Sequence, residues 1–287
     1  MRFAQILTLA ASFAAASIAL AQPGNPAQPA SAHKPANTNQ PPATTPATTQ
    51  PEQPAMPNAV PVPTGPVVKT SEVEGILIED IKIGEGYEVK PGGAVVAHYH
   101  GTLKADPSVT FDSSFERGEP IPFPLSGVIQ GWQKGVPGMK VGGVRRLTIP
   151  AALAYGAQSP SPKIPPNSDL VFVIQLVDAL QYEDVKVGEG EAATNSCVAV
   201  TAHVMKDKDG KEYNKHEASN PYIWLPGEFD AVSFGIEGMK VGGKRKITVP
   251  AKMNVVPMGI IDARPQDVPL TIELELIAVR NLPRRGR

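Results

Sequence analysis

One segment of this chain recurs one hundred positions further on. Residues 138–150 read GMKVGGVRRLTIP, and residues 238–250 read GMKVGGKRKITVP. A match of this length at a constant offset indicates a duplicated domain. The copies would span residues 71–180 and 181–281, and each is long enough to bury one modest core. The sequence therefore predicts two tandem domains of one fold, and we call them the first and second repeats.

Each repeat has the pattern of antiparallel strands. Residues 74–83 alternate isoleucine with polar side chains, and the stretches 94–103, 144–150 and 170–180 are apolar runs bounded by glycine and proline. Such runs are typical of strands that follow one another. The one helix expected in the first repeat covers residues 128–136, because Pro137 blocks its continuation. We therefore expect an α+β fold, with a twisted antiparallel sheet wrapped around one short helix in each repeat.

The N-terminal region predicts export. Arg2 precedes an apolar, alanine-rich run that ends in Ala19-Leu20-Ala21. This pattern is typical of a signal peptide over residues 1–21, cleaved after Ala21, and it predicts a periplasmic or secreted protein. An uncleaved anchor is the alternative. Residues 22–70 are mostly Pro, Ala, Thr, Asn and Gln, a composition that predicts a disordered linker.

Charge and cysteine content exclude several classes of function. The formal net charge is −1, so no global field attracts nucleic acid or an anionic membrane. The basic tail at residues 282–287 is best explained as a solvated chain end. With Cys197 as the single cysteine, the chain has neither a disulfide framework nor a cysteine-based metal site. His98 and His100 could face a metal together, but no carboxylate or cysteine clusters with them in the sequence, so we expect no metal.

Six motifs occur in order in the first repeat. They are HYHG at 98–101, FDSSFER at 111–117, VIQGW at 128–132, AYGA at 154–157, IPPN at 164–167 and LVF at 170–172. In this order and spacing they resemble the FKBP-type peptidyl-prolyl cis-trans isomerases. The resemblance covers the whole first repeat, and the second repeat resembles the same family more faintly.

The resemblance implies a pocket that takes the prolyl ring of a peptide. Trp132 would form its floor, Asp112 would lie at the rim paired with Arg117, and the Tyr155 hydroxyl and the Ile129 N–H would hold carbonyls of the peptide. Asp112, Tyr155 and Trp132 would be the catalytic residues. The expected substrate-binding residues are Tyr99, Phe111, Val128, Ile129, Ile164, Phe172 and Arg117.

The residue types suit this chemistry independently of the family. The planar X-Pro amide resists rotation with a barrier of roughly 20 kcal/mol. The twisted amide has less charge separation, so an apolar aromatic pocket favours twisting without a nucleophile, metal or cofactor. Taken singly, the aromatic residues could be plain core, and Asp112 could cap a turn. The ordered set favours a pocket.

The second repeat lacks most of this set. At the repeat offset, Val232 replaces Trp132 and Ile272 replaces Phe172. With small gaps, Ala202 falls opposite Tyr99. The other replacements are Val255 for Tyr155, the RPQ of residues 264–266 for IPP, and Tyr213-Asn214 for Phe111-Asp112. We expect this repeat to fold but not to isomerise proline.

The sequence thus predicts an exported isomerase that assists protein folding and acts on unfolded or nascent chains. A chaperone-like peptide-binding module with incidental isomerase activity is the alternative, and a stalked protein that uses its linker as a ligand is a weaker one. Macrolide immunosuppressants are possible ligands. The linker stands where relatives that dimerise often have a helical region, which favours a monomer.

Overall fold

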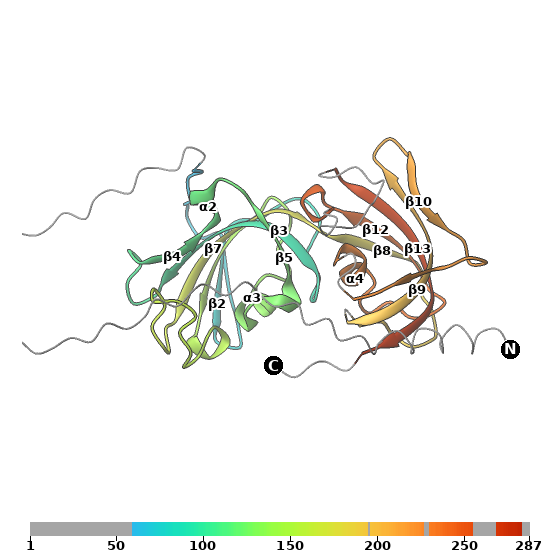
Figure 1. The fold of residues 1–287 in the computed structure, drawn as a ribbon. Coiled ribbons are helices and arrows are strands. Elements are labelled where there is room, and N and C mark those ends of the chain that lie inside the picture. The colour runs from blue at the N-terminus through green and yellow to red at the C-terminus, as the bar shows by residue number, and fades with distance from the viewer. Residues whose placement is uncertain (1–58, 195, 227–229, 255–267, 283–287) are drawn as a thin grey trace, which may run out of the picture. The chain divides into compact units, whose positions relative to one another are not determined.

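The computed structural model describes residues 59–194, 196–226, 230–254 and 268–282 (Figure 1). The expected signal peptide, most of the expected linker and nearly all of the basic tail lie outside these ranges. Within them, no helix is both long and apolar enough to cross a membrane. The chain is α+β, as predicted, with two antiparallel sheets and few, short helices.

The first repeat forms a sheet in the order β1-β2-β6-β7-β3-β4, with β5 beside β3. Its helices are α2 (Ser114–Arg117) and α3 (Gln130–Gly135), with 3-10 turns η1 (Leu125–Gly127) and η2 (Ala151–Leu153). The strands are β1 (Lys69–Val73), β2 (Ile76–Lys82), β3 (Ala94–Leu103), β4 (Thr110–Ser113), β5 (Ile121–Pro124), β6 (Val144–Ile149) and β7 (Leu170–Ala179).

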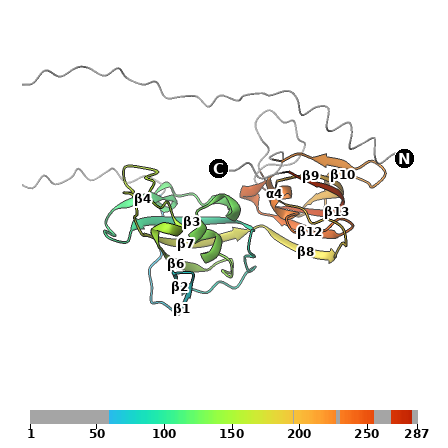
Figure 2. The same ribbon diagram turned by 90° about the horizontal axis from the view of Figure 1, so that it is seen from below.

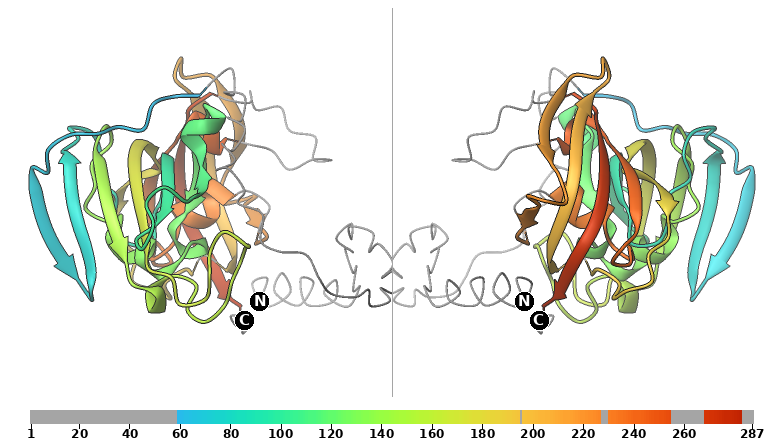
Figure 3. Two further views of the ribbon diagram at one scale, coloured as in Figure 1. Left: turned by 90° about the vertical axis from the view of Figure 1, so that its left-hand side faces the viewer. Right: turned by 90° about the vertical axis from the view of Figure 1, so that its right-hand side faces the viewer.

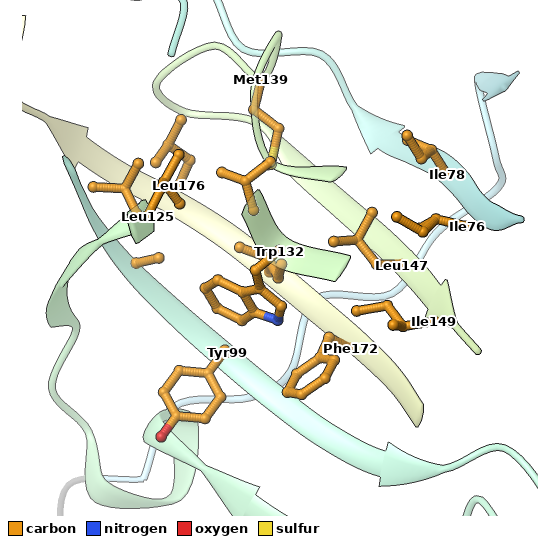
Figure 4. Close-up of a cluster of buried hydrophobic side chains, with 14 of the residues drawn as sticks. Ile76, Ile78, Tyr99, Leu125, Trp132, Met139, Leu147, Ile149, Phe172 and Leu176 are labelled. Carbon is orange, nitrogen blue, oxygen red and sulfur yellow. The ribbon is translucent and has the colours of Figure 1, made fainter. Parts of the chain in front are cut away.

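Helix α3 packs on the inner face of this sheet. Alternate residues of β7 are buried there, and β6 contributes Leu147 and Ile149. A Cβ added at Gly131 would lie 2.4 Å from Ile149, and one added at Gly135 would lie 2.8 Å from Leu147. Real Cβ atoms do not approach so closely, so the two glycines let the helix backbone contact β6 directly. This contact sets the depth at which Trp132 enters the core (Figure 4).

The second repeat has the order β10-β9-β13-β12-β8, with β11 beside β9. Its helix is α4 (Asp230–Gly235), with the 3-10 turn η3 (Ala251–Met253). The strands are β8 (Gln181–Lys186), β9 (Cys197–Asp207), β10 (Glu212–His216), β11 (Tyr222–Trp224), β12 (Lys244–Val249) and β13 (Leu270–Asn281). This order matches the first sheet strand for strand, except that β1 has no counterpart among the described residues.

An arginine clamp recurs in both repeats. Arg145 Nε lies 2.6 Å from Asp80 Oδ1, and its Nη1 donates to the carbonyl of Gly135 at 2.7 Å. Arg245 repeats both contacts, with Asp184 at 2.7 Å and the carbonyl of Gly235 at 2.8 Å. Each clamp ties β2 or its counterpart β8 to the last turn of the helix, and both arginines are buried. The tandem fold predicted from the repeated segment is therefore confirmed.

Two elements of the first repeat were not expected. Helix α2 forms because the Ser113 hydroxyl accepts from the N–H of Glu116 and Gly118 ends the turn with a φ of 76°. The expectation of a single helix was therefore wrong for the first repeat, since a one-turn helix with its own caps leaves no periodic pattern. Strand β1 begins at Lys69, two residues before the expected boundary, and lies with β2 at one edge of the sheet (Figure 3).

Candidate functional site

A pocket of about 800 Å³ opens between the inner face of the first sheet, α3 and the loop after η2. Nine of the ten predicted site residues line it: Tyr99, Phe111, Asp112, Val128, Ile129, Trp132, Tyr155, Ile164 and Phe172. Arg117 is the tenth; it does not line the pocket but contacts two residues that do. The structure therefore brings the predicted set together around one hollow.

Aromatic rings converge on Trp132 at the base of the pocket. The indole is 4% exposed and meets the rings of Tyr99, Phe123 and Phe172 edge to face, with centroid distances of 5.9, 5.5 and 5.4 Å. Figure 4 shows the indole above Tyr99 and Phe172. Edge-to-face packing fixes ring orientations, so the pocket has a rigid apolar base.

One wall of the pocket depends on a missing side chain. Phe111 packs edge to face on Phe172 with centroids 5.5 Å apart. A Cβ added at Gly101 would lie 2.5 Å from Phe111 and 3.0 Å from Phe172. Only glycine therefore leaves room for both rings on this side of β3. Gly101 belongs to the HYHG motif, but the motif alone does not show that this glycine makes room for two rings.

Asp112, Arg117 and Tyr99 form a connected group at the rim. Arg117 Nη1 donates to Asp112 Oδ1 at 2.6 Å, and its Nη2 donates to the Tyr99 hydroxyl at 2.8 Å. The Tyr99 hydroxyl in turn donates to Asp112 Oδ2. The three groups therefore hold one another in place, and the predicted pairing of Asp112 with Arg117 is present.

The contacts within this group also determine the protonation states of Asp112 and Tyr99. Partial burial alone would raise the pKa of Asp112, but hydrogen bonds from Tyr99 and Arg117 and the arginine charge outweigh it and hold that pKa below its ordinary value. Burial, with donation to Asp112, raises the pKa of Tyr99 to about 12. At neutral pH the rim therefore carries an ionised carboxylate and a neutral phenol.

Two potential donors face the pocket. The Tyr155 side chain is 38% exposed, and its hydroxyl has no hydrogen-bond partner within the described ranges. Its pKa is raised by burial and by the charge of Asp112. The N–H of Ile129, just before α3, likewise has no acceptor in the part of the chain that the structure describes. Both are placed to donate to a carbonyl in the pocket.

Comparisons with known proteins show which family the chain belongs to. The family model for FKBP-type peptidyl-prolyl cis-trans isomerases matches residues 86–177. Over 120 residues the chain is 45% identical to a probable FK506-binding protein of Corynebacterium glutamicum, in an alignment that covers 42% of this chain and 96% of that protein. The chain belongs to the FKBP-type peptidyl-prolyl cis-trans isomerases.

Other relatives of this isomerase match over the same region. Peptidyl-prolyl cis-trans isomerase FPR2 of Saccharomyces cerevisiae is 46% identical over 108 residues, which are 37% of this chain and 76% of FPR2. FkpA of Escherichia coli is 45% identical over 111 residues, but the match covers only 40% of FkpA and 39% of this chain. A crystal structure of FkpA aligns at 41% identity over 38% of this chain and 51% of that chain, with a TM-score of 0.35.

Several pocket residues of the isomerase were not predicted. They are Phe123, Gly127, Gln130, Gln133, Ala154 and Ser161. Phe123 could have been found, because it lies two residues after Ile121 in β5 and so faces the same side of the sheet as that apolar residue. Gln133 could not, since it reaches the mouth by donating to the carbonyl of Val128 at 2.8 Å. Within the described ranges, no three His, Cys, Asp or Glu side chains are grouped to hold a metal ion.

Strand register corrects the predicted alignment of the second repeat. Tyr99 pairs with Ile174 on β7, and His203 pairs with Leu274 on β13. His203, not Ala202, therefore occupies the position of Tyr99. Tyr99 and His203 are 104 positions apart, as are Asp80 and Asp184 of the arginine clamps, whereas Trp132 and Val232 are 100 apart. The offset changes because the second repeat has fewer residues between these strands and its helix. The match of Asn214 with Asp112 is supported. Asn214 pairs with Met205, Asp112 pairs with Gly101, and Met205 and Gly101 are equivalent at the offset of 104.

The second repeat fills this region with a different set of rings. Val232 and Ile272, which replace Trp132 and Phe172, are buried in its core. Met205 stands where Gly101 makes room for Phe111. The rings here are His203, His216, Tyr222 and Trp224, in successive contacts of 4.5 to 6.0 Å. Val255 and residues 264–266, expected opposite Tyr155 and IPP, lie outside the described residues.

Proposed function

We propose that this isomerase acts in the pocket of the first repeat and assists the folding of exported proteins. The observation that carries the proposal is the convergence of Tyr99, Phe111, Trp132 and Phe172 on one hollow with an ionised carboxylate at its rim. A prolyl ring would lie on the indole of Trp132. The amide that precedes it would then lie near Asp112 and Tyr155.

The pocket favours the twisted amide over the planar one. A planar amide is strongly polar and loses solvation when it leaves water, whereas the twisted form has less charge separation and loses less. The Tyr155 hydroxyl and the Ile129 N–H would hold carbonyls on either side of the rotating bond, which fixes the peptide in a bent arrangement. Asp112 would act electrostatically on the amide carbonyl as its conjugation breaks.

Two shape-preserving substitutions test this role. Asp112→Asn removes the charge, and Tyr155→Phe removes the hydroxyl. In a tetrapeptide isomerisation assay we expect kcat/KM to fall about tenfold for Asp112→Asn and roughly three- to tenfold for Tyr155→Phe, the cost of one interaction formed in the transition state. Tyr213→Phe in the second repeat is the matched control and should leave kcat/KM unchanged.

The same assay separates the alternative function. A chaperone-like module predicts little isomerisation by the wild type and no change in either variant, so that outcome would replace the enzyme by a peptide-binding protein. The pocket would also suit a macrolide, as the name of the Corynebacterium relative suggests for that protein. Such a ligand should compete with the tetrapeptide.

Export rests on the N-terminal sequence. Cleavage after Ala21 would produce a mature protein that begins at Gln22. Expression of the full chain in a Gram-negative host, followed by fractionation and intact-mass measurement, should find this shortened protein in the periplasm. A full-length protein that remains in the cytoplasm would refute export and leave the isomerase assignment intact.

A further inference from the structure

Strand β8 forms an open edge of the second sheet. Among the described strands it pairs only with β12, and Figure 2 shows it at the border of that sheet. Its residues Glu183, Asp184, Val185 and Lys186 are exposed, as is Val187 beyond it. Val185 and Val187 are 69% and 71% exposed and share one face of the chain. Two exposed apolar side chains therefore lie beside a backbone edge that no described strand covers.

The equivalent edge of the first repeat is covered. There β1 pairs antiparallel with β2, from Lys69 opposite Asp80 to Val73 opposite Ile76. The N–H of Val68 donates to the carbonyl of Asp80 at 2.8 Å. A Cβ added at Gly65 would lie 3.1 Å from Ile81, the counterpart of Val185, so the chain covers that side chain too.

Backbone pairing holds β1 in place. All five of its residues, Lys-Thr-Ser-Glu-Val, are exposed, so little side-chain burial contributes to its docking. An edge of this geometry therefore does not require particular side chains in the strand that pairs with it. In the first repeat the partner strand is β1, which folds back on β2 through a turn at Glu74 and Gly75, both with positive φ. In the second repeat β7 ends at Ala179 and β8 begins at Gln181, so no preceding segment can fold back.

We infer that the β8 edge binds an extended segment of an unfolded polypeptide, which adds as an antiparallel strand in the way that β1 adds to β2. This inference rests on the proposed function, which makes unfolded chains the substrate. Unpaired N–H and C=O groups of an edge strand are a template for another chain. Apolar side chains of the bound segment would lie against Val185 and Val187. Glu183 and Lys186 keep the edge hydrated, which suits weak and reversible binding.

The test compares matched variants of the full chain. Val185→Asp/Val187→Asp adds two carboxylates to the β8 edge, where they disfavour strand pairing. Val60→Asp/Ile83→Asp adds the same charge at exposed positions in and just before the first repeat that lie outside its strands. The probe is reduced, carboxymethylated α-lactalbumin, an unfolded chain, with binding followed by fluorescence anisotropy. Because both variants gain equal charge, general repulsion of this acidic probe cancels in the comparison.

We expect Kd for the unfolded chain to rise at least fivefold more in the β8 variant than in its control. Tetrapeptide kcat/KM should stay unchanged in both. Hydrogen exchange should show added protection of β8 amides when the probe is bound to the wild type. Val187→Asp alone, outside the strand, gives the same direction of change if the double variant folds poorly.

Equal Kd values for the two variants would overturn the inference. So would sedimentation that shows a wild-type dimer lost only in the β8 variant, because a second copy would then cover the edge. Absence of tetrapeptide isomerisation by the wild type would instead refute the proposed function, while a Kd difference would still locate a binding edge on β8.

Discussion

At the scale of single residues, the two repeats differ by a few exchanges at equivalent places. Gly101 admits Phe111 beside Phe172, whereas Met205 fills that space. Trp132 offers a flat apolar floor, whereas Val232 contributes only to a core. Since both repeats keep the arginine clamp, the loss of pocket residues does not disturb the fold that carries them.

His203 should make the second repeat sensitive to acid. It replaces Tyr99, is 4% exposed, and packs against His216 and Trp224. Burial and the charge of His216, partly offset by Asn214, lower the pKa of His203 to about 4. An unfolded chain binds this proton near pH 6.5. The stability that neutral His203 provides is therefore complete above pH 6.5 and is lost as the pH falls towards 4, by about 2 to 3 kcal/mol.

Urea unfolding between pH 7 and 4 measures this loss. The chain has two tryptophans, one in each repeat, so Trp132→Phe leaves Trp224 to report on the second repeat alone. His203→Phe in that background keeps a ring but removes the titration, and it should flatten the pH dependence by about the stated amount. Parallel curves with and without His203 would contradict the prediction.

At the scale of elements, regular strands were predictable and short, capped elements were not. The runs 94–103 and 144–150 match β3 and β6 to within a residue. Both are apolar runs next to glycine or proline, and most of their residues are buried, so the limits of each strand can be found from composition alone. Helix α2 is held by one hydroxyl cap and a glycine, and β1 by backbone pairing with fully exposed side chains. Neither element has a hydrophobic period, so neither could be predicted from the pattern of apolar residues.

At the scale of the whole molecule, catalysis should belong to one repeat. All nine predicted residues that line the pocket lie within residues 99–172. In the second repeat, Val232 and Ile272 stand in place of Trp132 at the floor and Phe172 in the wall of that pocket. The fragment 59–180 should therefore keep tetrapeptide kcat/KM within about twofold of the full chain. The fragment 181–287 should give no rate above the uncatalysed reaction.

The control for this experiment is folding. Each fragment should show cooperative unfolding followed by its own tryptophan, Trp132 or Trp224, before its rate is interpreted. Measurable isomerisation by a folded second fragment would show that the ring cluster around His203 forms a working site after all.

The sequence by itself determined that the domain is duplicated, that each copy is a sheet around a short helix, and which aromatic residues meet in the first copy. The duplication and the strands follow from the repeated segment and from local hydrophobic periods, which do not depend on contacts between distant residues. The set of aromatic residues follows instead from the resemblance of the ordered motifs to the FKBP family. The tertiary structure decided that Arg117 binds both Asp112 and Tyr99, that Gly101 makes room for two rings, and that His203 stands in place of Tyr99. Those facts depend on strand register and on loops of unequal length, and only the paired backbone fixes which side chains face each other.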